Sequence, residues 1–154
     1  MSNQREEILQ VAALCNGTVI DHIPSDVLFS VFSLLNLQNI EQPITIGNNF
    51  ESKKMSKKGI IKITDKFFED KEINKIAIIA PKAVLNIIRN YQVVEKKRLN
   101  LPDNIIDIVK CNNPKCITNN EPMKTQFEVL NHDHLELQCH YCNLKIKKED
   151  IVLK

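Results

Sequence analysis

The sequence predicts an α+β protein made of two domains, the first over residues 1–100 and the second over residues 101–154. In the first domain, short runs rich in Ile and Val alternate with two segments of helical character, which is typical of a sheet that carries helices. The second domain holds four of the five cysteines in two tight pairs, and its apolar residues alternate as in β-strands. A chain of 154 residues with 43% hydrophobic content can form two small cores.

The first domain is expected to begin with two short strands in LQVAALCNGTVIDHI, residues 9–23, joined at Asn16-Gly17. This dipeptide accepts the positive φ angles of a tight hairpin turn. A helix is expected next, because Pro24 suits a first helical position and the apolar residues that follow recur at helical spacing. These residues are Val27, Leu28, Val31, Phe32 and Leu35.

Two β-rich runs, PITIGNNF at 43–50 and KGIIKIT at 58–64, are expected to pair across the lysine-rich connection SKKMSKK. EDKEINK at 69–75 indicates a shorter second helix, and the β-rich segments IAIIAP, AVLNII and YQVVEK follow it. The order strand, helix, two strands, helix, strand matches a ferredoxin-like domain, in which one sheet face carries the helices. A ligand, the second domain or a partner subunit should cover the other face. KKRLNLPDN at 96–104 is expected to connect the domains.

The cysteine pairs CNNPKC at 111–116 and CHYC at 139–142 have metal-ligand spacing. Each pair can offer two sulfurs from one turn, and four thiolates complete the tetrahedral shell that Zn²⁺ prefers. The sequence therefore predicts one structural Zn²⁺ in a zinc-ribbon or rubredoxin-like domain, because a closed shell leaves no position for a reactive water. The predicted ligands are Cys111, Cys116, Cys139 and Cys142.

The apolar residues around these cysteines are too few for a large core, so we expect the metal to help hold the domain together. They are Phe127, Val129, Leu135, Leu137, Ile146, Val152 and Leu153. Two disulfides or unligated thiols are the alternative, which a reducing cytoplasm disfavours. A cytoplasmic location is expected because no secretory pattern and no long apolar run occur in the sequence.

Other residues near the cysteines or in apolar runs are expected to have ordinary structural roles. With four cysteines available, His132, His134 and His140 are expected at the surface or in support of the ligands. Cys15 lies in an apolar run and is expected to be a small buried core residue.

The charge distribution argues against nucleic acid as a partner. The net charge is +2, and residues 111–154 hold six Lys/Arg and six Asp/Glu. With four thiolates and one bound Zn²⁺, the net charge of this domain would be about −2, which is unfavourable for binding nucleic acid. A nucleic-acid-binding zinc ribbon stays an alternative through the basic runs KKMSKK and LKIKK.

The sequence contains no nucleophile motif and no glycine-rich phosphate loop, so any phosphate would be held by lysines. Asp21 and His22 follow a predicted strand, where a structural hydrogen bond between them is the simpler interpretation. Lys62 and Lys96 lie on predicted strands and would ordinarily be solvated.

Several motifs together resemble the regulatory chains of aspartate carbamoyltransferase: GTVIDHIP, ITIG, GIIKI, IAPKAVLNIIRNYQVVEK and Cys-x4-Cys…Cys-x2-Cys, in this order over nearly the whole chain. The resemblance implies a non-catalytic subunit with an N-terminal allosteric domain and a C-terminal zinc domain that docks on the catalytic chain. In that family CTP inhibits and ATP activates pyrimidine biosynthesis by competing for one site. UTP is a further candidate effector, and the regulatory chains are expected to pair as dimers.

The resemblance places the nucleotide site on eleven residues: Ala13, Leu14, Val19, Asp21, His22, Lys62, Asn86, Ile88, Tyr91, Val93 and Lys96. Backbone groups near Leu14 and Tyr91 would read the base, whose exocyclic amine needs a carbonyl acceptor. Ile88 and Val93 would form the apolar walls of the base site.

The sugar and phosphates would meet the charged residues of this set. Asp21 and Lys62 would hold the ribose hydroxyls, while His22 and Lys96 would face the phosphates. For Lys58, added charge near the phosphates and a solvated role stay equally open.

The resemblance leaves some features of regulation open. Asn49, Lys53 and Lys54 lie in a loop that varies in the family, so a second nucleotide or metal-assisted site is not assigned there. The direction and size of each effector's influence also vary among members. An amino-acid-binding regulatory domain of the same architecture is a third reading, which the phosphate-facing lysines disfavour.

Overall fold

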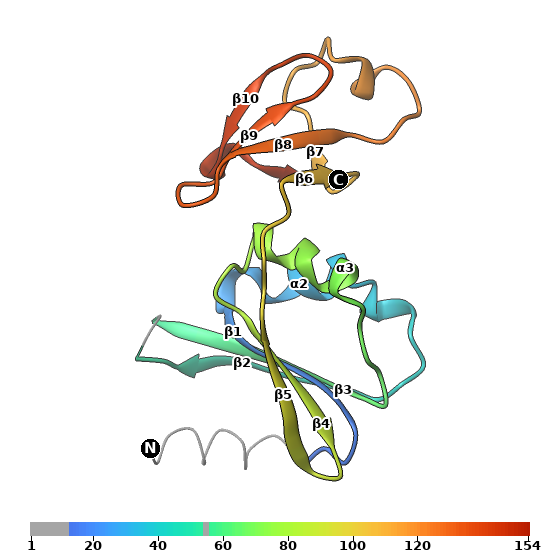
Figure 1. Ribbon diagram of the computed structural model, residues 1–154, viewed down its shortest axis with the longest axis vertical. Helices are drawn as coiled ribbons and strands as arrows, with labels where there is room; N and C mark the ends of the chain where they lie inside the picture. Colours follow the sequence, from blue (N-terminus) through green and yellow to red (C-terminus); the bar gives the residue numbers. More distant parts are fainter. Residues whose placement is uncertain (1–12, 54–55) are drawn as a thin grey trace. The chain divides into compact units, whose positions relative to one another are not determined.

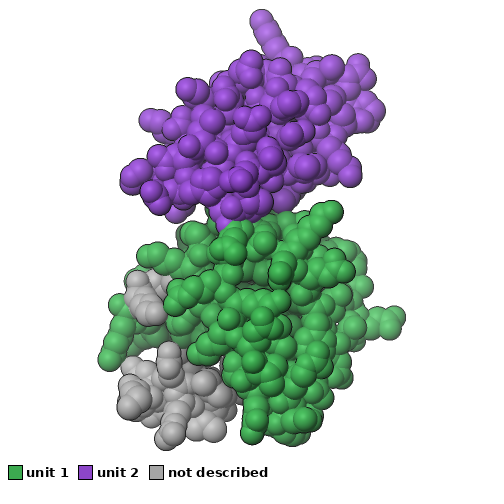
Figure 2. All heavy atoms as spheres, in the orientation of Figure 1, with its two compact units in different colours: residues 1–100 green, residues 101–154 purple. Residues whose placement is uncertain are grey.

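The computed structural model describes residues 13–53 and 56–154. The chain divides into two compact units, residues 1–100 and residues 101–154, which Figure 2 shows in different colours. Among the described residues, no helix is long and apolar enough to cross a membrane.

The first unit is built on a five-stranded antiparallel sheet in the order β2-β3-β1-β4-β5. Its strands are β1 (Gly17–Pro24), β2 (Ile44–Glu51), β3 (Lys57–Thr64), β4 (Val84–Arg89) and β5 (Gln92–Arg98). Helix α2 (Leu28–Leu34) connects β1 to β2, and α3 (Asp70–Ile73) connects β3 to β4, both on one face of the sheet (Figure 1). The first four strands have the predicted ferredoxin-like order, and β5 adds to the edge as a hairpin with β4. Short 3₁₀ helices complete the unit: η1 (Ser25–Val27), η2 (Leu37–Asn39) and η3 (Asn74–Ile78).

The core of this unit lies between the sheet and the helices. Ile20 pairs directly with Ile61 of β3 and with Leu85 of β4, and these three side chains are at most 1% exposed. Leu28 and Val31 of α2 are fully buried as well. The predicted first helix is thus confirmed, because its apolar stripe is what the sheet requires for burial.

Three expectations for the first unit are wrong. No hairpin forms across Asn16-Gly17, because both edges of β1 are already occupied by β3 and β4; residues 9–12 of its first strand lie outside the described residues. The segment IAIIAP is not a strand: its first half, Ile76 to Ile78, belongs to η3, whose consecutive buried residues resemble a buried strand in composition. Cys15 is half-buried rather than a core residue, and its Sγ accepts a hydrogen bond from Asn16 Nδ2 at 3.4 Å.

The boundaries of two polar segments also differ from expectation. Lys57, which was expected in the exposed connection, begins β3, so the strand starts one residue before the predicted run KGIIKIT; Lys54 lies outside the described residues. Lys96 to Arg98 belong to β5, and β6 begins at Asn104, so the connection between the units is shorter than predicted.

The second unit is β-rich, as predicted. A four-stranded antiparallel sheet has the order β10-β9-β8-β6, and β11 pairs with β7. Its elements are β6 (Asn104–Ile106), β7 (Val109–Lys110), η4 (Ile117–Asn119), β8 (Gln126–Asn131), β9 (Glu136–Cys139), β10 (Lys145–Lys147), η5 (Lys148–Asp150) and β11 (Val152–Leu153). Phe127 and Leu137 are fully buried and Ile146 is 2% exposed, whereas Val152 is 50% exposed and lies outside the core.

Candidate functional site

The four paired cysteines of the second unit come together in space. Their Sγ atoms all lie within 4.8 Å of one another. Sγ of Cys111 is 3.6 Å from that of Cys142, and Sγ of Cys116 is 3.8 Å from that of Cys139. Because a disulfide requires about 2.0 Å, these are separate thiols arranged as a group that could hold a metal ion.

The local backbone brings each pair of sulfurs to one turn. Cys111 directly follows β7 and Cys116 directly precedes η4, while Cys139 ends β9 and Cys142 lies in the turn before β10. In this last turn the Asn143 N–H donates to the Cys139 carbonyl at 2.9 Å, and Asn143 has φ +62°.

Asparagine side chains brace the other turn. Asn119 Nδ2 donates to the carbonyl of Cys111 at 2.9 Å and to that of Asn113 at 2.7 Å. Asn120 Nδ2 donates to the carbonyl of Cys116 at 2.8 Å. These bonds fix the first cysteine turn through side chains whose role the cysteine spacing alone does not reveal.

The electrostatics of the cluster suit a bound cation. Burial raises the pKa of Cys111 and of Cys139, since a thiolate is poorly solvated there. Burial alone would also raise the pKa of Cys142, but the Leu144 backbone N–H and other hydrogen bonds to the sulfur lower it to about 7. Four adjacent thiolates would repel one another without a positive ion between them, so this donor set fits a thiophilic divalent metal.

The three nearby histidines lie outside this cysteine group. His132 Nε2 is 3.1 Å from Asp103 Oδ1, and His140 Nδ1 is 3.8 Å from Glu128 Oε1. His134 is exposed. The surface roles expected for them agree with these positions.

On the first unit, four of the predicted nucleotide-site residues form one row across the sheet. Val19 of β1 pairs with Lys62 of β3 and with Asn86 of β4, and Asn86 pairs with Lys96 of β5. Directly paired residues project to the same face, and neighbours along a strand project to opposite faces. The neighbouring Ile20 is fully buried in the core between the sheet and the helices. This row therefore lies on the face opposite α2 and α3, which we call the open face.

The row contains polar groups that are poorly satisfied. Lys62 is only 6% exposed, and burial lowers its pKa, with no carboxylate among the described residues to compensate. The Asn86 Oδ1 atom is buried and has no hydrogen-bond partner among the described residues. Lys96, by contrast, is exposed. Buried polar groups normally have partners, so this row is a candidate ligand site.

A second group of predicted residues gathers at the β4-β5 turn. Ile88 pairs with Gly17 of β1 and with Val93 of β5. The turn residues Asn90 and Tyr91 both have positive φ, 51° and 64°. The Tyr91 N–H donates to the Cys15 carbonyl at 3.0 Å, so the segment that follows the exposed Ala13 and the buried Leu14 lies against this turn.

Asp21 and His22 lie at a β-bulge, where the register between β1 and β3 shifts and His22 has φ +58°. Oδ1 of Asp21 accepts the His22 backbone N–H at 2.6 Å and lies 3.3 Å from Nζ of Lys58. Lys58 is 3% exposed, so a solvated role for it is wrong. Strand alternation is the signal for this lysine, because Lys58 and Lys62 fall on the same face of β3.

Comparisons with known proteins cover both units. Residues 9–100 match the model of the aspartate carbamoyltransferase regulatory chain allosteric domain, and residues 103–152 match that of its metal binding domain. The chain is 61% identical over 154 residues to the aspartate carbamoyltransferase regulatory chain of Parabacteroides distasonis, covering 100% of both chains. It is 59% identical over 151 residues to that of Phocaeicola vulgatus, covering 98% of this chain and 97% of the relative. Identity to that of Thermococcus sibiricus is 45% over 146 residues, covering 95% and 96%.

Proposed function

The chain belongs to the aspartate carbamoyltransferase regulatory chain family, and from this premise we propose that it binds nucleotide effectors on its open face and carries one Zn²⁺ in its second unit. It is a regulatory subunit rather than a catalytic one. The effectors would be CTP and ATP, with UTP as a third candidate, and their competition would control pyrimidine biosynthesis. The proposal is supported most directly by the row Lys62, Val19, Asn86 and Lys96, which contains a buried lysine that has no carboxylate partner among the described residues.

The charges of the open face suit a polyphosphate. Lys96 is exposed at the edge strand, while Lys58 and His22 both lie near Asp21, at 3.3 Å and 3.9 Å from its carboxylate oxygens. An anionic ligand would offset the unfavourable burial of Lys62, so binding would relieve an electrostatic cost of the folded protein. Because Asp21 neutralises part of the charge of Lys58, we expect Asp21 to be shared between this lysine and the ribose hydroxyls.

The base would lie near the β4-β5 turn. The Tyr91 N–H already donates to the Cys15 carbonyl. The exocyclic amine of a base is a donor, so it would donate to backbone carbonyl groups of this region. Ile88, 8% exposed, and Val93, 51% exposed, offer apolar contacts of unequal depth. Ala13 is exposed and could contact a base from the outside.

For the second unit, we propose Zn²⁺ as the metal of Cys111, Cys116, Cys139 and Cys142. Zn–S bonds of about 2.3 Å in tetrahedral geometry place the sulfurs about 3.8 Å apart. The separations of 3.6 Å and 3.8 Å between two sulfur pairs are close to this value. When bound, the ion would offset two of the four thiolate charges and join the two cysteine turns, a structural contribution.

The partners follow from the family. We propose that the second unit docks on catalytic chains and that two regulatory chains pair through their first units, in the cytoplasm, where the thiols stay reduced. No nucleic-acid partner is proposed. Effector control then requires a coupling free energy of about 1 to 3 kcal/mol between the open face and the catalytic chains.

Calorimetry with CTP and ATP tests the nucleotide site. The two ligands should compete, and Lys96→Ala should weaken both by about 10-fold, as for the loss of a charge-assisted contact. Lys82→Ala is the matched control, since Lys82 is exposed and lies in the turn before β4. Unchanged affinities in Lys96→Ala would remove this residue from the site, and heat with amino acids but none with nucleotides would favour an amino-acid-binding domain.

Co-expression with the catalytic chain of the same organism tests assembly. The two chains should co-purify, and CTP should change the activity of the complex. If the two chains do not co-purify, the proposed role as a subunit of this complex is wrong.

A further inference from the structure

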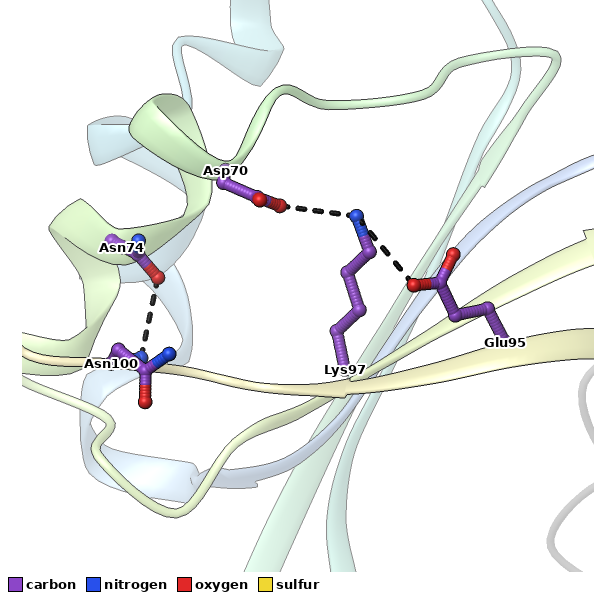
Figure 3. Close-up of polar contacts among 5 residues, drawn as sticks. All are labelled: Asp70, Asn74, Glu95, Lys97 and Asn100. Carbon is purple, nitrogen blue, oxygen red and sulfur yellow. Dashed lines mark hydrogen bonds and ion pairs between the residues drawn. The ribbon is translucent and has the colours of Figure 1, made fainter.

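A group of polar contacts lies where the chain leaves the first unit (Figure 3). We call it the exit latch, and its members are Asp70, Asn74, Glu95, Lys97 and Asn100. Nζ of Lys97 is 3.0 Å from Oδ1 of Asp70 and 3.9 Å from Oε1 of Glu95. The Asn100 backbone N–H donates to Oδ1 of Asn74 at 3.2 Å.

The latch lies on the segment that connects the open face to the rest of the chain. β5 is the last strand of the first unit, and Asn100 is the last residue of that unit. Lys96 pairs with Asn86 in the open-face row, whereas the next residue, Lys97, pairs with the core residue Leu85. One strand therefore presents a candidate ligand residue on one face and a latch residue on the other.

The end of β5 has sheet hydrogen bonds on one side only and is anchored by the buried side chain of Leu99. Among the described residues, β5 is an edge strand whose sheet neighbour is β4. Its last pair is Arg98 with Val84, so beyond Arg98 the Asn74 side chain takes over the backbone contact at Asn100. An edge strand with one neighbour can shift more easily than a central strand. Contacts at its end then determine which neighbouring segment moves with it.

The other side of the latch is a short helical segment. α3 has four residues and lacks a side-chain cap at its start, and η3 follows it directly. Such short helices are unstable alone and take their position from packing. Ile73 and Ile76 anchor this segment in the core, while Asp70 and Asn74 reach from it to β5 and to Asn100.

We propose that the exit latch transmits ligand occupancy of the open face to the chain that leaves the first unit. The inference rests on the proposed nucleotide site at Lys96. A phosphate held by Lys96 displaces β5, and the latch couples this displacement to Asn100 and to the α3-η3 segment, which Ile73 and Ile76 anchor in the core. Without the latch, the end of β5 moves independently of α3, and its displacement does not reach α3 or Asn100.

Activity of the complex with catalytic chains provides the first test. In Asp70→Asn and in Lys97→Met, the Kd for CTP should stay within about twofold of wild type, while the ratio of activities without and with CTP should fall by about two- to fivefold, a part of a typical allosteric coupling factor. The double variant Asp70→Lys with Lys97→Asp restores an opposite-charge pair and should recover the response. Glu72→Gln is the control, because Glu72 lies on the same helix and its side chain has no polar partner in the described part of the chain.

Hydrogen exchange at the Asn100 amide reports on the latch itself, which an activity assay does not. CTP should change its exchange rate in the wild-type complex and in Glu72→Gln, and the change should disappear in Asp70→Asn and in Asn74→Ala. A merely structural latch would alter basal exchange or stability and leave the response to CTP intact, which would overturn the inference. If wild type does not bind CTP at all, the proposed function fails first; if it binds and the latch variants respond as wild type does, only the latch fails.

Discussion

Replacing Lys62 with Met should weaken nucleotide binding without destabilising the ligand-free protein. Met has a similar length, so it fills the space beside Val19 without the charge. Lys62 is 6% exposed, and burial lowers its pKa, with no carboxylate to compensate in the part of the chain that the structure describes. Replacing this largely buried lysine removes the desolvation cost of its charge, so the free energy of unfolding should stay equal or rise by on the order of 1 kcal/mol.

The effect on the ligand has the opposite sign. Hydrogen bonds to charged groups contribute about 1.5 to 3 kcal/mol, so the Kd for CTP should rise by about 10- to 150-fold. Calorimetry on wild type, Lys62→Met and the exposed control Lys82→Met measures this ratio, and urea denaturation of the same proteins measures stability.

The pH dependence gives an independent signature. The pKa of Lys62 is lower in the folded protein than in the unfolded chain, so the unfolded chain binds more protons between the two values. The free energy of unfolding should therefore rise with pH from the lowered pKa towards 10.5, and Lys62→Met should lack this rise. A variant that loses stability while its Kd for CTP stays unchanged would show that Lys62 serves the fold and not the ligand.

Three further predictions concern the backbone of the first unit and the metal unit. Gly17→Ala should lower the free energy of unfolding, measured by urea denaturation, by about 2 kcal/mol or more. Gly17 has φ +147°, and a Cβ there would lie 2.1 Å from the Ile63 carbonyl oxygen. A variant as stable as wild type would mean that β1 can shift to make room. Phe127→Ala should destabilise the second unit by about 3 to 5 kcal/mol, since this ring is fully buried, and a loss below about 1 kcal/mol would contradict its place in the core. A mercurial that displaces the proposed Zn²⁺ from the cysteine cluster should unfold the second unit and release the subunit from catalytic chains, as seen by size exclusion; stripped protein that stays assembled would show that the metal does not shape the docking contact.

The elements that sequence periodicity predicted well are those with one clear buried face. The apolar stripe of α2 and the alternation in the strands of the second unit depend on local spacing, which neighbours in sequence decide. The segment IAIIAP shows the limit of this reasoning. Ile76 to Ile78 are three consecutive buried residues, a pattern that is compatible with either a buried strand or a 3₁₀ helix. Only packing against the sheet selects the 3₁₀ helix.

The turns required information that composition does not hold. Asn16-Gly17 suits a hairpin locally, yet no partner strand can join β1 there, because β3 and β4 occupy both of its edges. Asn90-Tyr91 makes a tight turn although a tyrosine with positive φ is unusual, and its contact with Cys15 helps to hold it. Tertiary contacts overrode local preference in both cases.

By itself, the sequence determined the two-part organisation, the four-cysteine pattern and the fact that Lys58 and Lys62 share one face of a strand, because all three depend on residues close together in the chain. Only the tertiary structure decided that Lys62, Val19, Asn86 and Lys96 form one row, that Lys58 is buried against Asp21, and that Lys97 and Asn100 meet α3 and η3. These relations depend on strand register and on the bulge at His22, which are set by pairing between distant segments. A shift of one residue in that pairing would leave the local pattern unchanged and move every side chain to the opposite face.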